Sequence, residues 1–139
     1  MSEQNKALVR KFYEEVFNRG NVAAIDQLCD TRFVDHTPGP GQSGGGVAGM
    51  KEMVAMFRSA FPDMKATVDE LVAEKDTVVA RITVVMTHKG AFMGAAPTGK
   101  KVTMRGLDMI RFKNGKATDV WHYGDEAMVM MQLGVKPPA

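Results

Sequence analysis

Four segments of the chain carry apolar residues every three or four positions, which is the spacing of one face of an α-helix. The predicted helices cover residues 2–18, 22–28, 47–60 and 126–133. Gly20 ends the first helix, Asn21 is expected to cap the second, and Pro62 ends the third. Three helices are therefore expected in the first half of the chain and one near its end.

The remaining segments alternate apolar with polar residues or carry runs of β-branched residues, as strands do. Strands are expected over residues 33–36, 65–74, 77–88, 102–112 and 117–124. Turns at Lys75-Asp76 and Asn114-Gly115 join two pairs of them. Helices followed by consecutive strands predict an α+β fold, with helices covering one face of a curved sheet. The stretch 37–46, rich in Gly and Pro without phosphate-loop spacing, is expected to form a flexible flap beside a site.

The hairpin of the last two strands decides which side chains share a face of the sheet. A two-residue turn at Asn114-Gly115 would place Ile110 on the face of Trp121, whereas a three-residue loop would place it beside Val120. We prefer the three-residue loop, because a slip by one residue would separate the apolar side chains. The core-facing set then consists of Asp108, Ile110, Phe112, Thr118, Val120 and His122.

Asp108 and His122 become neighbours on the core-facing side in this register. A carboxylate beside an imidazole on an apolar face is typical either of a buried ion pair or of a catalytic acid/base pair. His122 can exchange a proton near neutral pH, so we expect Asp108 to orient one ring nitrogen while the other faces a substrate. His36, after a short strand, is expected near the mouth of the pocket as a second polar contact, or bonded to the backbone. Tyr13 is expected to offer its hydroxyl to the pocket.

Three further residues have structural expectations. Cys29 is expected to fill the core as part of the second helix, because a free cysteine is usually buried. His88 ends a strand and is expected to be exposed. Asp125 precedes the last helix and is expected to cap it through its side chain.

Composition narrows the class of protein. The 139 residues are most simply one domain, 1–139, with 45% hydrophobic and 24% charged residues. The formal net charge of +2 and the scattered Lys and Arg argue against nucleic acid as a partner. The single cysteine excludes an intrachain disulfide and a cysteine-based zinc site, and the histidine spacings predict no metal. No apolar stretch suits a signal segment or a membrane span, so we expect no membrane partner and a cytoplasmic protein.

Several short motifs, taken together and in order, are typical of one protein family. They are His36-Thr37-Pro38, Phe61-Pro62-Asp63-Met64, the run from Ala96 to Lys100 leading into Gly106–Phe112, Asn114-Gly115-Lys116, Trp121-His122 and Gln132–Val135. In this order, over nearly the whole chain, the sequence resembles the SnoaL-like polyketide cyclase (ester cyclase) family of the nuclear transport factor 2-like superfamily. The resemblance implies a cone-shaped α+β barrel fold. In it a strongly curved mixed or antiparallel sheet wraps around the N-terminal helices and encloses an apolar pocket.

The resemblance also implies an activity. The best-described family members close a polyketide ring by intramolecular aldol condensation without a cofactor. They carry His on the first strand of the hairpin and Asp directly after the Trp of the second. Here the two residue types are exchanged, with Asp108 on the first strand and His122 after Trp121.

These observations favour a cofactor-independent enzyme with general acid/base chemistry, of cyclase, aldol or isomerase type, on a small, largely apolar carbonyl compound. The catalytic candidates are His122, Asp108 and His36, and the substrate-binding candidates are Tyr13, Phe57, Phe92, Phe112 and Val120. A non-catalytic ligand-binding domain is the alternative. An epoxide hydrolase ranks last, because Arg81 and Arg105 alternate away from the Asp108 face. Trp121 is expected on the outer face, where it suggests a homodimer contact.

Overall fold

The computed structural model describes residues 2–39 and 42–135, so Pro40 and Gly41 of the predicted flap lie outside the described residues. Its elements are α1 (Ser2–Phe12), the π-helix η1 (Tyr13–Asn18), α2 (Ala23–Leu28), β1 (Cys29–Asp35), α3 (Val47–Ala60), β2 (Lys65–Glu74), β3 (Thr77–Thr87), β4 (Lys101–Lys113), β5 (Lys116–Gly124) and α4 (Glu126–Gln132). The predicted α+β class is confirmed, with helices and strands in the predicted order. No helix in these ranges has the length and apolar character needed to cross a membrane.

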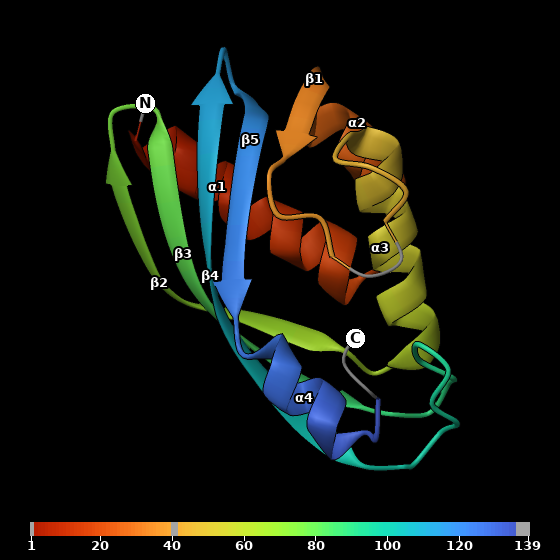
Figure 1. The fold of residues 1–139 in the computed structure, drawn as a ribbon. Coiled ribbons are helices and arrows are strands. Elements are labelled where there is room, and N and C mark those ends of the chain that lie inside the picture. The colour runs from red at the N-terminus through yellow and green to blue at the C-terminus, as the bar shows by residue number, and fades with distance from the viewer. Residues whose placement is uncertain (1, 40–41, 136–139) are drawn as a thin grey trace.

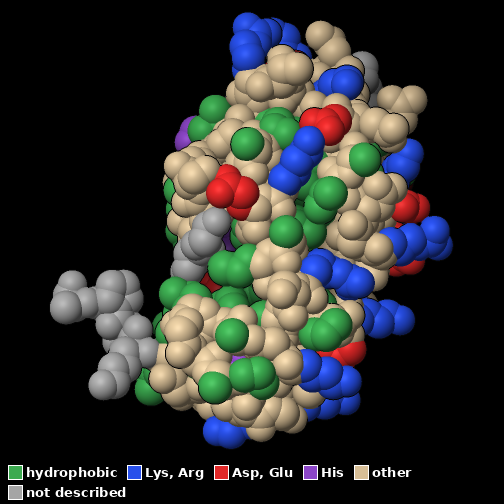
Figure 2. Space-filling view, turned by 90° about the vertical axis from the view of Figure 1, so that its right-hand side faces the viewer, with side chains coloured by type: hydrophobic (Ala, Val, Ile, Leu, Met, Phe, Trp, Pro, Cys, Tyr) green, Lys and Arg blue, Asp and Glu red, His purple; other side chains and the backbone are tan. Residues whose placement is uncertain are grey.

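The five strands form one mixed sheet in the order β1-β5-β4-β3-β2. β1 runs parallel to β5, and the other neighbours are antiparallel. The sheet bends around α1, while α2 and α3 close the concave side and α4 packs beside β4 (Figure 1). Strands β1 and β2 are the two edges of the sheet. The sheet is strongly curved, as in a cone-shaped fold, but because of these edges it is not closed into a barrel. On the side that carries α2 and α3, apolar side chains reach the surface in small groups between polar ones (Figure 2).

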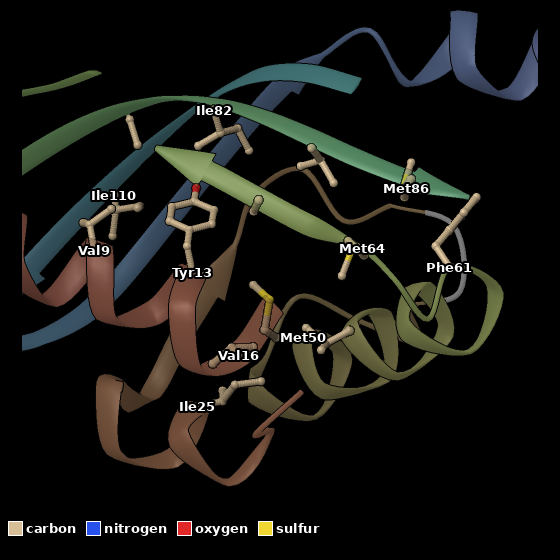
Figure 3. Close-up of a cluster of buried hydrophobic side chains, with 14 of the residues drawn as sticks. Val9, Tyr13, Val16, Ile25, Met50, Phe61, Met64, Ile82, Met86 and Ile110 are labelled. Atoms are coloured by element: carbon tan, nitrogen blue, oxygen red, sulfur yellow. The ribbon is translucent and has the colours of Figure 1, made fainter. Parts of the chain in front are cut away.

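The core lies between the concave face of the sheet and the helices. Val9 and Tyr13 point from the first helical segment toward the sheet, where Ile110 and Ile82 lie on β4 and β3, and Val16 lies beside Met50 and Ile25 of α3 and α2 (Figure 3). These residues are almost completely buried. Their spacing in the chain is that of one helix face and of alternate strand positions, so the predicted periodicities produce this packing.

Ile25 offers a test of this packing, because its side chain in α2 is completely buried. Ile25→Ala is expected to lower the free energy of unfolding by about 2–5 kcal/mol, since the removed methyl groups lose their burial and leave a cavity. Urea denaturation at neutral pH measures the change. A loss below about 0.5 kcal/mol, typical of surface substitutions, would contradict the placement of α2 against the core.

Two local expectations about the helices are wrong. The first helix does not continue regularly to Asn18, because the backbone changes to a π-helical turn at Tyr13. Asn21 does not cap α2: Val22 occupies the cap position, and no side chain bonds to the free N–H groups there. Cys29 is buried as expected, but it begins β1 rather than ending the helix.

The β4–β5 hairpin has the predicted register with a different turn. Lys113 pairs with Lys116, so the loop is the two-residue turn that we rejected, with positive φ angles of 52° at Asn114 and 77° at Gly115. The register then shifts, because Arg111 pairs with Asp119 and leaves Thr118 as an extra residue. This β-bulge restores the pairing of Ile110 with Val120 and of Asp108 with His122. The predicted face is therefore confirmed for Asp108, Ile110, Phe112, Val120 and His122, although the loop is one residue shorter. The expectation that Thr118 faces the core is wrong, because Ala117 is the buried residue opposite Phe112.

Candidate active site

A cavity of about 270 Å³ lies between the concave face of the sheet and the helices. Most of its lining is apolar, and it comes from the helical segments α1, η1, α2 and α3 and from the strands β1, β3, β4 and β5. Its polar side chains are Tyr13, Asp35, Thr37, Gln42, Asp108, His122 and Glu126. A mainly apolar hollow with a few convergent polar groups is the usual form of a small-molecule site.

Four of these side chains form a continuous row of hydrogen bonds. The Tyr13 hydroxyl donates to Oδ2 of Asp108, and Oδ1 of Asp108 contacts Nδ1 of His122. The other ring nitrogen, Nε2, contacts Oε1 of Glu126. The four residues come from η1, β4, β5 and the start of α4, so the whole fold assembles the row. Gly106 makes room for it, because a Cβ there would lie 2.8 Å from Cε1 of His122.

The two carboxylates keep the imidazole charged. Burial alone lowers the pKa of His122, but the hydrogen bonds to Asp108 and Glu126 outweigh it and raise this pKa from 6.5 to about 10. For Glu126, burial raises the pKa, and the contact with His122 more than offsets this and lowers it below 4.5. His122 is therefore an imidazolium at neutral pH. The expectation of one ring nitrogen facing a substrate is wrong, because Glu126 occupies that nitrogen.

A second polar group lies beside this row. The Asp35 side chain is buried and accepts hydrogen bonds from the Thr37 backbone N–H at 2.9 Å and from Nε2 of Gln42 at 3.2 Å. The Thr37 hydroxyl in turn accepts the backbone N–H of His122 at 2.8 Å. The segment that follows β1 is thereby fixed to β5 at the polar end of the cavity.

The cavity lining is acidic. Three carboxyl groups line the cavity, those of Asp35, Asp108 and Glu126. Among the described residues that line it, His122 is the only basic one, and there is no Lys or Arg. Among residues 2–39 and 42–135, the groups that donate hydrogen bonds to the Asp35 side chain are all neutral. The carboxyl groups would repel a ligand that carries a carboxylate or phosphate group. Little water separates them from a ligand in the cavity, so this repulsion is only weakly screened.

The structure places the remaining predicted site residues as follows. Tyr13, Phe57, Phe112 and Val120 line the cavity as expected. Phe92 does not line it, because its ring packs against Phe57 and Phe61, with centroids 5.4 and 5.2 Å apart.

His36 lies outside the cavity, on the outer face of the sheet. Its ring stacks on Trp121 at 4.3 Å between centroids, and its Nε2 lies 2.8 Å from Oδ2 of Asp119. Because neighbouring side chains of a strand point to opposite faces, the inward direction of Asp35 sends His36 outward. The expectation of His36 at the pocket mouth is therefore wrong. Trp121 is on the outer face as predicted, near the exposed side chains of Val34, Leu107 and Tyr123. A dimer contact there stays a prediction.

Two other residues differ from expectation. His88 is completely buried, where its Nδ1 accepts the backbone N–H of Thr98 at 3.2 Å. After this strand the chain turns back, so that the segment around Thr98 covers the His88 ring. Strand periodicity alone does not predict such a covering segment. Asp125 occupies the cap position of α4, but its Oδ1 accepts the backbone N–H of Arg105 at 2.8 Å instead of capping the helix.

Sequence reasoning missed Glu126 and Asp35. A weak signal existed for each: Glu126 follows His122 by four residues across a strand end, and Asp35 alternates with the apolar Phe33. Burial of the Cys29 thiol, which also lines the cavity, raises its pKa to about 12. That thiol is protonated at neutral pH and is not an activated nucleophile.

Comparisons with known proteins agree with this architecture. The family model described as SnoaL-like polyketide cyclase matches residues 7–133. A candidate polyketide cyclase from Acidithiobacillus ferrooxidans superposes with a TM-score of 0.84 at 31% identity, covering 96% of each chain. AclR from Streptomyces galilaeus, a candidate hydroxylase, gives 0.84 at 29% identity, over 100% of this chain and 86% of its own.

IdmH from Streptomyces antibioticus, a candidate polyketide cyclase, superposes with a TM-score of 0.79 at 31% identity, over 94% of this chain and 98% of its own. A search of curated proteins gave no match. Because the family model spans most of the chain and the solved structures share its fold, the protein belongs to the SnoaL-like polyketide cyclase family.

Proposed function

We propose that the protein catalyses proton transfer, without a cofactor, on a small, neutral and largely apolar carbonyl compound, as a cyclase, aldol-type or isomerase-type enzyme. One observation carries the proposal: the hydrogen-bonded row Tyr13–Asp108–His122–Glu126 lies at the polar end of an otherwise apolar cavity. Family membership and the candidate polyketide cyclases among similar structures support the reaction class.

In the proposed reaction, Asp108 is the proton acceptor. The C–H bond next to the substrate carbonyl breaks, its proton goes to the Asp108 carboxylate, and the electron pair moves to the carbonyl oxygen. The Tyr13 hydroxyl is the donor that turns to the resulting enolate, and the positive charge of the His122 imidazolium stabilises it. The enolate then attacks a second carbonyl carbon and closes a ring, and the alkoxide that forms takes the proton back from Asp108. Alternatively, the enolate of an unsaturated ketone takes that proton back at another carbon.

This assignment changes the role of His122. An imidazolium with a pKa of about 10 has no free nitrogen to accept a proton at neutral pH, and both of its N–H groups are bonded to carboxylates, so it acts through its positive charge. Glu126 holds it from the other side. Arg81 and Arg105, on which an epoxide hydrolase would depend, are exposed, and neither lines the cavity. A non-catalytic binding domain is the competing function, and the experiment below separates the two.

Deuterium exchange tests the proposal without knowledge of the natural substrate. A neutral aryl alkyl ketone is incubated with the protein in D₂O, and the loss of its α-proton signal is followed by ¹H NMR. We expect faster exchange than in buffer, because Asp108 removes the α-proton. If calorimetry shows that ketones bind, but their α-protons exchange no faster than in buffer, the protein is a binding domain instead.

The acidic lining predicts selectivity against anions. A neutral ketone is expected to bind at least about tenfold more tightly than the analogue in which its terminal methyl group is replaced by a carboxylate. That ratio corresponds to about 1.4 kcal/mol, a modest repulsion for a charge beside three carboxyl groups. Calorimetry at neutral pH measures both affinities. Equal affinities would contradict the charge pattern assigned to the site.

A further inference from the structure

A second hollow lies at the end of the molecule where the β2–β3 and β4–β5 turns meet the beginning of α1 (top of Figure 1). Its volume is about 410 Å³, and its lining consists of Gln4, Asn5, Leu8, Lys75, Asp76, Phe112, Asn114 and Gly115. Among the lining residues that the structure describes for the two hollows, Phe112 is the only one they share. The apolar cavity and this surface hollow are thus neighbours with Phe112 between them.

The position of Phe112 is fixed on both sides. Its backbone N–H donates to the carbonyl oxygen of Asp76 at 2.8 Å, which holds the end of β4 against the β2–β3 turn. Its strand partner is Ala117, directly before the β-bulge. The small alanine side chain opposite leaves room for the phenyl ring, and Phe112 is only 6% exposed.

The distance from the polar end of the cavity to this ring follows from the strand. Asp108 and Phe112 are four residues apart on β4 and point to the same face. At about 3.3 Å per residue, their Cα atoms are separated by about 13 Å along the strand. A ligand whose carbonyl group lies at Asp108 therefore has about this length available before it meets the phenyl ring.

We propose that Phe112 is the wall that closes the apolar end of the cavity, and that it determines the longest ligand the site accepts. Removal of the ring joins the cavity to the surface hollow, and the apolar chain of a longer ligand then extends between α1 and the two turns, beside Leu8. The ligand class is an unbranched, neutral chain with a carbonyl group at one end. The location of that carbonyl group at Asp108 rests on the proposed function, whereas the wall itself does not.

The test is calorimetric titration with a homologous series of unbranched 2-alkanones. For the wild-type protein, affinity is expected to rise about fourfold for each added methylene group until the chain reaches Phe112, and then to stop rising. In Phe112→Ala the rise is expected to continue over longer chains. Phe112→Leu, which disturbs the core less, is expected to shift the limit in the same direction by a smaller amount.

Phe92→Ala is the matched control, because Phe92 is a buried phenylalanine of the same core that lines neither hollow. It is expected to leave the length limit unchanged. The proposal is wrong if the limit is the same in wild type and both Phe112 variants, if Phe92→Ala moves it equally, or if the wild type binds no member of the series. A shifted limit without α-proton exchange would instead refute the proposed function and leave the wall in place.

Discussion

Asp108→Asn is expected to slow the proton exchange of a bound ketone by a factor of about 10² to 10⁴. The amide has nearly the shape of the carboxylate but accepts no proton at neutral pH. It can still hydrogen-bond with the Tyr13 hydroxyl and the His122 ring, so the fold is expected to persist. The measurement is the rate of α-proton loss in D₂O at a saturating ketone concentration, with ketone affinity determined in parallel.

Asp119→Asn is the matched control on the same hairpin. Asp119 also contacts a histidine, His36 at 2.8 Å, but on the outer face of the sheet. The hydrogen bond from His36 lowers the pKa of Asp119, so this substitution also removes an ionised carboxylate. It is expected to leave the exchange rate unchanged. Equal losses in the two variants, or no loss in Asp108→Asn, would show that the proton goes elsewhere.

His122→Gln is expected to lower the free energy of unfolding by about 3 kcal/mol at neutral pH, since it leaves Asp108 and Glu126 without the cation between them. The folded-state pKa of His122, about 10, lies above its ordinary value of 6.5. The stabilisation is therefore complete below pH 6.5 and is lost as the pH rises through about 10. Urea denaturation of both proteins across this range measures it.

The gap in stability between wild type and His122→Gln is thus expected to narrow toward pH 10. His36→Gln serves as the control, because His36 has one carboxylate neighbour and lies on the exposed face. Adding Glu126→Gln to His122→Gln is expected to recover part of the loss by removing one of the two facing carboxylates. If the difference in unfolding free energy between wild type and His122→Gln does not change with pH, then packing of the His122 ring, and not its charge, stabilises the fold.

Long elements could be predicted from the sequence because their periodicity extends over many residues. The third helix, 47–60, agrees at both ends with α3, and the ends of the strands in both hairpins agree to within one residue. The π-helical turn at Tyr13 left no such signal, because the residues that follow it keep apolar side chains on the core side. That turn belongs to the segment that presents the Tyr13 hydroxyl to Asp108.

The pairing of Asp108 with His122 could be predicted although the turn was wrong. The argument depended on keeping Ile110, Phe112 and Val120 on one face, and burial of apolar side chains satisfies that condition whatever the loop length. The bulge at Thr118 supplied the missing residue. Glu126 could not be placed in this way, because it follows the end of β5, where the chain direction changes and alternation no longer fixes the direction of a side chain. His36 was misplaced for a different reason: the inward direction of Asp35, which sends His36 outward, was not recognised.

The stack of His36 on Trp121 has a consequence for optical work on this protein. Trp121 is the sole tryptophan of the chain, and it lies on the outer face with Arg111 5.1 Å above its ring. Its fluorescence therefore reports the outer surface of the sheet, and a ligand that fills the cavity leaves its surroundings unchanged. A ligand titration that is monitored by tryptophan emission would therefore show no change even when the ligand binds. A second indole introduced at Phe57, which lines the cavity from α3, supplies a reporter on the side where ligands bind.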